Sequence, residues 1–312
     1  MLGPHALTIG LVNNMPDGAF ADTEAQFRRA LAAPGRGVRL ALYTLPQIER
    51  GEAVSEIIAA RYGDLEQLWL RPPDALVVTG TEPLRAQLCH EAYWPDLAQL
   101  LSWAAECVPT VLLSCLAAHA GVLLFDGISR VPRATKCCGV FAGAVDRGAD
   151  LLTGGLPSRV RVPHSRANDI PEASLIEAGY RIAVGSDPAA AGWSIATRAV
   201  GRATFVLCQG HPEYGRLSLL REYRRDVRRS LLSGGARPYP RIPEGYLSPP
   251  AIATLSGFER WATESTGDPR ALVGAFPYEQ VAATVTNSWK ATSAVLYRNW
   301  LELARESLAV AA

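Results

Sequence analysis

Short apolar runs that end in polar or small residues recur along the first half of the chain and predict buried β-strands. Between them, apolar residues recur at helical spacing, and Asp22 or Thr23 is the predicted N-cap of the first helix. Alternating strands and helices predict a parallel sheet with helices on both faces, and right-handed crossovers make it a doubly wound α/β sheet. The predicted strands are 7–14, 38–45, 74–83 and 109–114, and the predicted helices are 20–33, 93–107 and 116–125.

The second half of the chain is richer in strands, and its pattern then changes again. Ser233 to Pro277 carries many Gly and Pro residues and is predicted to be a loop, whereas Gln280 to Ala309 has the apolar spacing of a helix. We therefore expect an α/β domain at 1–235 and a segment at 236–312 whose C-terminal helix packs on that domain or on a second subunit. The other predicted elements are strands 158–165, 180–186, 192–198 and 203–210 and a helix at 218–232.

The sheet type predicts where a ligand binds. In a doubly wound sheet, ligands lie beyond the carboxyl ends of the strands. The loops after Asn13, Thr79 and Ser114 are therefore expected to meet at one crevice.

Composition and charge exclude several classes of protein. The chain has 312 residues, 48% of them hydrophobic, which is enough for a large core, and its formal net charge is +1. The overall basic balance of a nucleic-acid-binding protein is therefore missing. A local cluster of arginines is interpreted as the solvated face of a helix. Its members are Arg221, Arg224, Arg225, Arg228 and Arg229.

Cysteine usage and the N-terminus point to a reduced, cytoplasmic protein. None of the six cysteines belongs to a CxxC pair, so zinc-ribbon and thioredoxin interpretations fail and no metal site is expected. Met1 to Ala6 lack the basic start and apolar run of a signal peptide. Because no apolar stretch is long enough to span a bilayer, we expect no membrane partner.

Cys115 stands where the predicted strand 109–114 meets the predicted helix 116–125. A helix N-terminus offers unpaired N–H groups and a partial positive charge, which favour the thiolate, the nucleophilic form of cysteine. The amide of Leu116 would be an oxyanion donor, as the residue after the nucleophile is in related elbows. Buried structural cysteines are common, so position alone leaves a packing role open.

A nucleophile needs a base, and His211 is the best placed of the five histidines. It follows the apolar strand 203–210, whose end is expected to face the same crevice as Cys115. Glu213 lies two residues on, where its carboxylate can fix the imidazole tautomer and stabilise the charged ring. His119 could simply pack in its helix. The three residues Cys115, His211 and Glu213 are the predicted catalytic set.

Several blocks of residues, in order along the chain, resemble those of the MetA-type homoserine O-acyltransferases. A cysteine after one strand and an HPE tripeptide after a later strand also resemble the class I glutamine amidotransferase fold with its Cys-His-Glu triad. The C-terminal NSWK…YRNWL (287–301) is similar as well. The blocks are VNNMP (12–16), DTEAQF (22–27), VVTGTEPL (77–84), AYWP (92–95), SCLAAHA (114–120), TKCCGVF (135–141), PHSR (163–166), GHPEY (210–214) and YRRDV (223–227).

The resemblance implies homoserine O-succinyl transfer on the route to methionine, with the O-acetyl reaction as the near alternative. An acyl-CoA co-substrate, succinyl-CoA or acetyl-CoA, would acylate Cys115, and the hydroxyl of L-homoserine would then take the acyl group. No bound cofactor is implied, and a homodimer is expected. Backbone amides near Gly80 or Thr81, together with that of Leu116, would hold the oxyanion.

The resemblance also implies a set of substrate-binding residues. Lys136, Ser165 and Arg225 match family positions that line the substrate site, and Arg225 suits an amino-acid carboxylate through bidentate pairing. Leu84 stands where the family has the Gly or Glu that helps to choose the acyl group. The run here is TGTEPL, which adds a carboxylate at Glu82 and leaves the acyl group open between succinyl and acetyl.

Two other functions stay open beside O-acyl transfer to homoserine, for which serine is an alternative acceptor. One is a glutamine amidotransferase-type hydrolase, although those enzymes usually carry Gly on both sides of the nucleophile, and Ser114-Cys115-Leu116-Ala117 does not. The other is a paralogue that only binds an amino acid or CoA, which would not need Cys115, His211 and Glu213 together.

Overall fold

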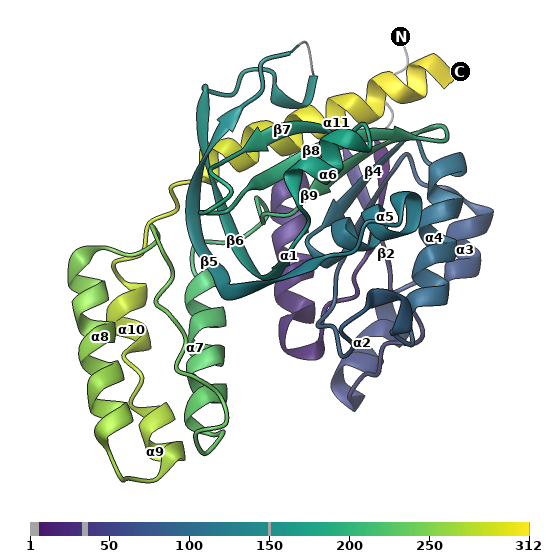
Figure 1. Ribbon diagram of the computed structural model, residues 1–312. Coiled ribbons are helices and arrows are strands. Elements are labelled where there is room, and N and C mark those ends of the chain that lie inside the picture. The colour runs from purple at the N-terminus through teal and green to yellow at the C-terminus, as the bar shows by residue number, and fades with distance from the viewer. Residues whose placement is uncertain (1–5, 33–36, 149–150, 312) are drawn as a thin grey trace.

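One nine-stranded sheet runs through the computed structural model, which describes residues 6–32, 37–148 and 151–311 (Figure 1). The predicted α/β class is confirmed. Its five parallel strands form one half, and its last four strands pair antiparallel. In spatial order the strands are β2 (Val38–Tyr43), β1 (Leu7–Val12), β3 (Ala75–Thr79), β4 (Thr110–Ser114), β9 (Ala203–Cys208), β8 (Trp193–Val200), β7 (Arg181–Gly185), β5 (Val131–Val145) and β6 (Arg159–Asp169).

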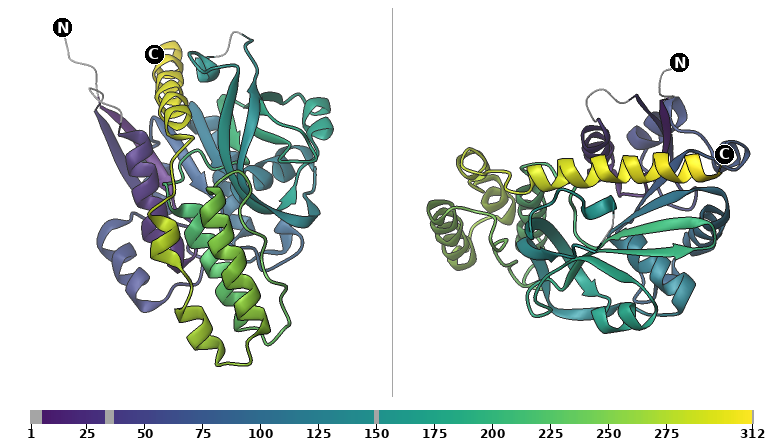
Figure 2. Two further views of the ribbon diagram at one scale, coloured as in Figure 1. Left: turned by 90° about the vertical axis from the view of Figure 1, so that its left-hand side faces the viewer. Right: turned by 90° about the horizontal axis from the view of Figure 1, so that it is seen from above.

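Both faces of the inner parallel strands β1, β3, β4 and β9 are covered, which is why these strands are mainly apolar. Side chains alternate between the faces: Leu76 and Val78 of β3 belong to one core cluster, and Val77 belongs to the other. The first cluster lies under α3, α4, α5 and α6, and the second under α1 and α11, which contact each other beside the sheet (Figure 2). These helices are α1 (Asp17–Leu31), α3 (Leu65–Leu70), α4 (Trp94–Cys107), α5 (Leu116–Asp126), α6 (Glu172–Glu177) and α11 (Lys290–Ala311).

A third core cluster lies beside the sheet in a bundle of four helices and contains residues of three of them (Figure 1). Val140 of β5 and Trp289, in the segment before α11, attach this bundle to the rest of the molecule. Its helices are α7 (Ser218–Leu231), α8 (Pro249–Glu264), α9 (Pro269–Gly274) and α10 (Tyr278–Ala282). The remaining helices are α2 (Glu52–Arg61) and two 3₁₀ turns, η1 (Leu88–His90) and η2 (Leu151–Thr153).

The predicted loop from Ser233 to Pro277 is wrong, because this segment contains α8 and α9. Ser248 is the N-cap of α8, and two prolines fill its first positions, where no N–H is needed. The prolines that suggested a loop are therefore, at this point, the first residues of a helix. Ala251, Leu255, Phe258 and Ala262 are buried at helical spacing and form the inner face of α8.

The C-terminal segment is also different from the single helix predicted over 280–309. The chain leaves α10 after Ala282 and begins α11 at Lys290. The apolar residues on the two sides of this break serve different cores: Val281 packs in the bundle, and Trp300 packs under the sheet. The helical spacing of apolar residues over 280–309 therefore comes from two separate helices.

The N-cap prediction of Asp22 or Thr23 is wrong as well. Helix α1 begins at Asp17, with Pro16 as its N-cap, and the Asp17 carboxylate accepts the backbone N–H of Gly51 at 2.7 Å. This tertiary contact holds the start of the helix. Ala33, the last residue of the predicted helix, and Met1 to His5 lie outside the described residues.

Strand β5 was not predicted, because its first half is largely exposed and lacks the alternation of a half-buried strand. It pairs with β6 across an irregularity between Pro132 and Cys137. Across the described ranges, no helix combines the length and the apolar character needed to cross a membrane.

Candidate active site

The junction of β4 and α5 holds Cys115 in an unusual backbone conformation. Its φ is 51° and its ψ is −106°, and it is the one non-glycine residue of positive φ in the described ranges. Its N–H donates to the carbonyl of Cys208, at the end of the adjacent strand β9, at 2.7 Å. The sharp turn therefore puts the sulfur at the carboxyl edge of the sheet, where the chain turns at once into a helix.

The loop after β9 places His211 and Glu213 beside that sulfur. The Nδ1 atom of His211 lies 2.8 Å from Oε1 of Glu213, and the imidazole lies close enough to the Cys115 side chain for that side chain to raise the imidazole pKa. With Nδ1 held by the carboxylate, Nε2 is left for the thiol. The His211 N–H also donates to the carbonyl of Pro163 at 2.7 Å, which fixes the loop against β6. The structure thus brings the three predicted catalytic side chains together.

Two hydroxyl groups orient the carboxylate of Glu213. Ser114 Oγ donates to Oε1 at 3.1 Å, and Tyr297 of α11 donates to Oε2 at 3.5 Å. Because Glu213 is almost fully buried, these donors matter for keeping its charge in place. The C-terminal helix therefore directly contacts the cluster formed by Cys115, His211 and Glu213.

The electrostatics favour a charged imidazole. Burial acts to lower the pKa of His211, but the charges of Cys115 and Glu213 and their hydrogen bonds overcome it and raise this pKa well above its usual range. By contrast, burial raises the pKa of the neighbouring Cys208 thiol well above its ordinary value and keeps that sulfur neutral. An imidazolium is the natural partner of a thiolate, so Cys115 and His211 are the candidate reactive pair.

The other buried histidines cannot serve as the base. Burial lowers the pKa of His119 to about 4, and its Nε2 lies 2.9 Å from Oε1 of Gln209. Burial and the nearby Arg166 lower the pKa of His164 well below its usual value, and its Nε2 lies 2.9 Å from Ser194 Oγ. His119 packs in its helix, as the sequence allowed.

The predicted oxyanion donors differ in their availability. The amide of Gly80 donates to the carbonyl of Ser114 at 3.2 Å, so Gly80 is not a free donor, contrary to the sequence-based expectation. A Cβ at Gly80 would lie 2.4 Å from Leu116 Cβ, so this glycine lets the β3 loop touch the start of α5. The amides of Thr81 and Leu116 donate to no protein acceptor in the described part of the chain.

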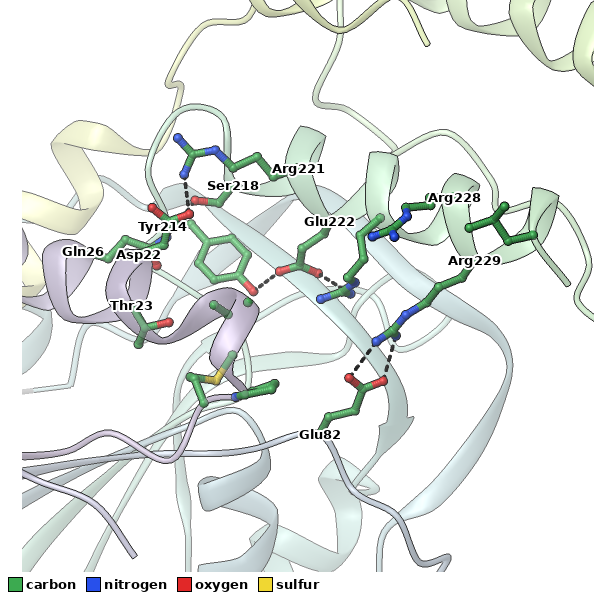
Figure 3. Close-up of a pocket in the computed structure, with 16 residues that line it drawn as sticks. Asp22, Thr23, Gln26, Glu82, Tyr214, Ser218, Arg221, Glu222, Arg228 and Arg229 are labelled. Atoms are coloured by element: carbon green, nitrogen blue, oxygen red, sulfur yellow. Dashed lines mark hydrogen bonds and ion pairs between the residues drawn. The ribbon is translucent and has the colours of Figure 1, made fainter. Parts of the chain in front are cut away.

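A cleft of about 660 Å³ opens beside this cluster, between α7 and the start of α1 (Figure 3). Tyr214 connects the two, because its ring stacks on His211 at 4.1 Å and also lines the cleft. Arginines of α7 form one wall, and small or apolar residues before and within α1 form much of the other. The His211 imidazole thus lies next to the cleft, on the other face of the Tyr214 ring contact.

Comparison with known proteins shows the family of this chain. A family model described as Homoserine O-succinyltransferase matches residues 4–307. The chain belongs to the homoserine O-succinyltransferase family. It is an acyltransferase.

Curated relatives match over nearly the whole chain. A Homoserine O-succinyltransferase from Bradyrhizobium japonicum is 43% identical over 96% of this chain and 90% of its own length. Another from Rhodopseudomonas palustris is 41% identical over 95% and 88%. A solved glutamine amido transferase from Methylobacillus flagellatus is 14% identical, covers 96% of this chain and 94% of its own, and has a TM-score of 0.50, which shows the shared fold.

Three predicted substrate residues of the family converge on one carboxylate, that of Glu222. Ser165 Oγ donates to it, Arg225 Nη2 lies 3.7 Å from it, and Lys136 Nζ lies 3.8 Å from it. Lys136 and Arg225 also pair with Asp226, at 2.6 Å and 3.2 Å. Of the three, only Arg225 lines the cleft.

The fourth predicted substrate residue, Leu84, lies apart from the cleft. Its side chain is 87% exposed and does not line that cavity. Glu82, two residues earlier, does line it and pairs with Arg229 at 2.7 Å and 2.9 Å. The departure from the family pattern in this loop therefore acts on the cleft through Glu82.

Sequence reasoning missed several residues that surround the site. Glu222 stands in the predicted helix 218–232, but only the tertiary fold shows that its carboxylate accepts hydrogen bonds from Ser165 and Tyr214. Tyr297, which donates to Glu213, lies far away in the sequence. The charge of Cys115 also acts on Arg130, which donates to the carbonyls of Arg85 and Ala86, both at 3.0 Å. Within the described ranges, no three metal-binding side chains gather at one point.

The backbone of Cys115 generates a stability prediction. Because positive φ is unfavourable for a residue with a Cβ, Cys115→Gly should be more stable than Cys115→Ala by about 1–3 kcal/mol. Urea unfolding of the two variants measures the difference. Ala118, inside α5, is the control position, where the change Ala118→Gly should lower the free energy of unfolding. An alanine variant at 115 as stable as the glycine variant would show that this turn stores no strain.

The ion pair generates a prediction for thiol reactivity. Because a charged His211 ring beside the sulfur favours the nucleophilic thiolate, iodoacetamide should alkylate Cys115 about tenfold faster at pH 7 than it alkylates the exposed Cys89 and Cys107, which are internal controls. Peptide mass spectrometry follows each cysteine. In His211→Asn, Cys115 should behave like the controls; unchanged reactivity of that variant would contradict the pairing.

Proposed function

We propose that this protein transfers a succinyl group from succinyl-CoA to the hydroxyl of L-homoserine through a thioester on Cys115. The observation that carries the proposal is the contact between the Cys115 thiol and the His211 imidazole, which Glu213 holds from the other side. Family membership supplies the substrates, and the geometry supplies a nucleophile with a charged partner.

In the first half-reaction, the Cys115 thiolate attacks the thioester carbonyl of the acyl-CoA. The amides of Thr81 and Leu116 stabilise the oxyanion of the tetrahedral intermediate. Collapse of the intermediate breaks the bond to CoA sulfur, and the imidazolium of His211 gives its proton to the departing thiolate. The products are free CoA, the acylated cysteine and a neutral imidazole.

In the second half-reaction, His211 acts as the base. It takes the proton of the homoserine hydroxyl as that oxygen attacks the Cys115 thioester. Collapse releases the O-acyl amino acid and returns the thiolate beside an imidazolium. Glu213 keeps Nδ1 protonated throughout, so Nε2 is always the atom that gives or takes the proton.

The acceptor is expected at the inner end of the cleft. Arg225 and Glu222 stand one helical turn apart, and a guanidinium beside a carboxylate is complementary to the zwitterion of an amino acid. Lys136 and Ser165 would position this pair through Glu222 and Asp226. Leu84 is left out of the proposed acceptor site because of its exposure.

We also propose that residues 1–235 carry the chemistry and that residues 236–312 complete the site, since Tyr297 of α11 contacts Glu213. A cytoplasmic location, where acyl-CoA is made and used, and a homodimer stay predictions.

Intact-mass measurement tests the proposed function. Purified protein mixed with succinyl-CoA should gain one succinyl group, which hydroxylamine should remove because it is held as a thioester. Cys115→Ser should form no such thioester. L-Homoserine should discharge the group and L-serine should not. Loading by acetyl-CoA alone would change the donor to acetyl. Failure of both acyl-CoAs, together with glutamine hydrolysis, would instead favour the amidotransferase-type hydrolase whose fold this chain shares.

A further inference from the structure

The arginines of α7 are more than a solvated helix face. Arg221, Arg225, Arg228 and Arg229 all line the cleft, and Arg224 of the predicted cluster instead lies over the ring of Tyr278. Their spacing of four, three and one residues puts them along one side of the helix. Figure 3 shows Arg221, Arg228 and Arg229 along this side, with Glu82 facing Arg229. The cleft therefore has a cationic wall.

The carboxylates of the cleft neutralise only part of this charge. Asp22 pairs with Arg221 at 2.6 Å, Glu82 pairs with Arg229, and Glu222 lies 3.7 Å from Arg225. Four arginines and three carboxylates line the cavity, which leaves one positive charge over. That charge belongs to Arg228, whose guanidinium has no hydrogen bond or ion pair with any residue of the described chain.

The position of Arg228 points to the end of the donor that does not react. Helix α7 leads away from the loop that carries His211, so Arg228 lies about 15 Å beyond Ser218 at 1.5 Å per residue over 10 residues. Tyr214, stacked on His211, marks the inner end of the cleft, and Leu232 belongs to the outer end. A ligand that fills the cleft would place its reactive group inside and its far end by Arg228.

Acyl-CoA matches this layout, because its thioester and its phosphates lie at opposite ends of a long arm. Phosphate groups prefer arginine forks, and an apolar residue such as Leu232 gives a base a surface to lie on. On the basis of the proposed function, we propose that Arg228, at the outer end of the cleft, binds the phosphates of the nucleotide end of the acyl-CoA donor.

Arg228→Gln tests this assignment with two donors. One is succinyl-CoA, and the other is the succinyl thioester of N-acetylcysteamine, which keeps the thioester end and lacks the nucleotide. The variant should raise KM for succinyl-CoA about tenfold and leave kcat/KM for the truncated donor unchanged. Arg228→Glu should have a larger effect and Arg228→Lys a smaller one. Arg71→Gln, at the end of α3 and before β3, is the control that should change neither donor.

Each outcome decides the matter. An unchanged KM for succinyl-CoA in both Arg228→Gln and Arg228→Glu would overturn the phosphate site. An equal loss with both donors would also overturn it, because the residue would then act near the thioester. If the wild-type protein is acylated by neither donor, the proposed function itself fails. The site is supported if the difference in KM for succinyl-CoA between Arg228→Gln and the wild type becomes smaller at high salt. Salt screens the ionic contact with the phosphates, which only the wild type makes.

Discussion

The site depends on one hydrogen bond between strand ends, from the N–H of Cys115 to the carbonyl of Cys208. It joins β4 to β9 at the residue where β4 turns into α5, and His211 follows three residues after Cys208. Adjacent strands lie within about 5 Å of each other, so this bond brings the thiol and the imidazole together although nearly a hundred residues separate them. The positive φ of Cys115 is the cost of that position, since it aims the sulfur out of the sheet.

Hydrogen-bonded groups surround the His211 imidazole on two sides. On one side, Ser114 and Tyr297 donate to the buried carboxylate of Glu213, whose charge helps to raise the pKa of His211. On the other side, the ring of Tyr214 stacks on the imidazole, and the Tyr214 hydroxyl donates to Glu222. His211 and Glu213 are thus almost fully shielded from solvent, and electrostatic interactions between them are strong. The arginine-lined cleft is open to solvent, which suits the binding of a substrate more than the transfer of a proton.

The sequence predicted those features that depend on local patterns. Buried parallel strands are apolar runs, so β1, β3 and β4 and the chemistry at their ends could be read directly. Features set by tertiary contacts could not: the exposed start of β5 carries no alternation, and α8 begins with two prolines that looked like loop residues. Gly80 is similar, because only the coordinates show its amide bound to Ser114. Glu222 needed the fold to reveal its donors.

The central claim is that Cys115 and His211 form a thiolate–imidazolium pair, and NMR of ¹⁵N-labelled histidine tests it most directly. In the wild-type protein, the His211 ring should stay doubly protonated at pH 7.5, because its pKa lies well above the usual value. In Cys115→Ala, the charge that helps to raise this pKa is gone, so the ring should titrate at lower pH. A His211 ring that is neutral at pH 7.5 in the wild type, or that titrates alike in both proteins, would contradict the account.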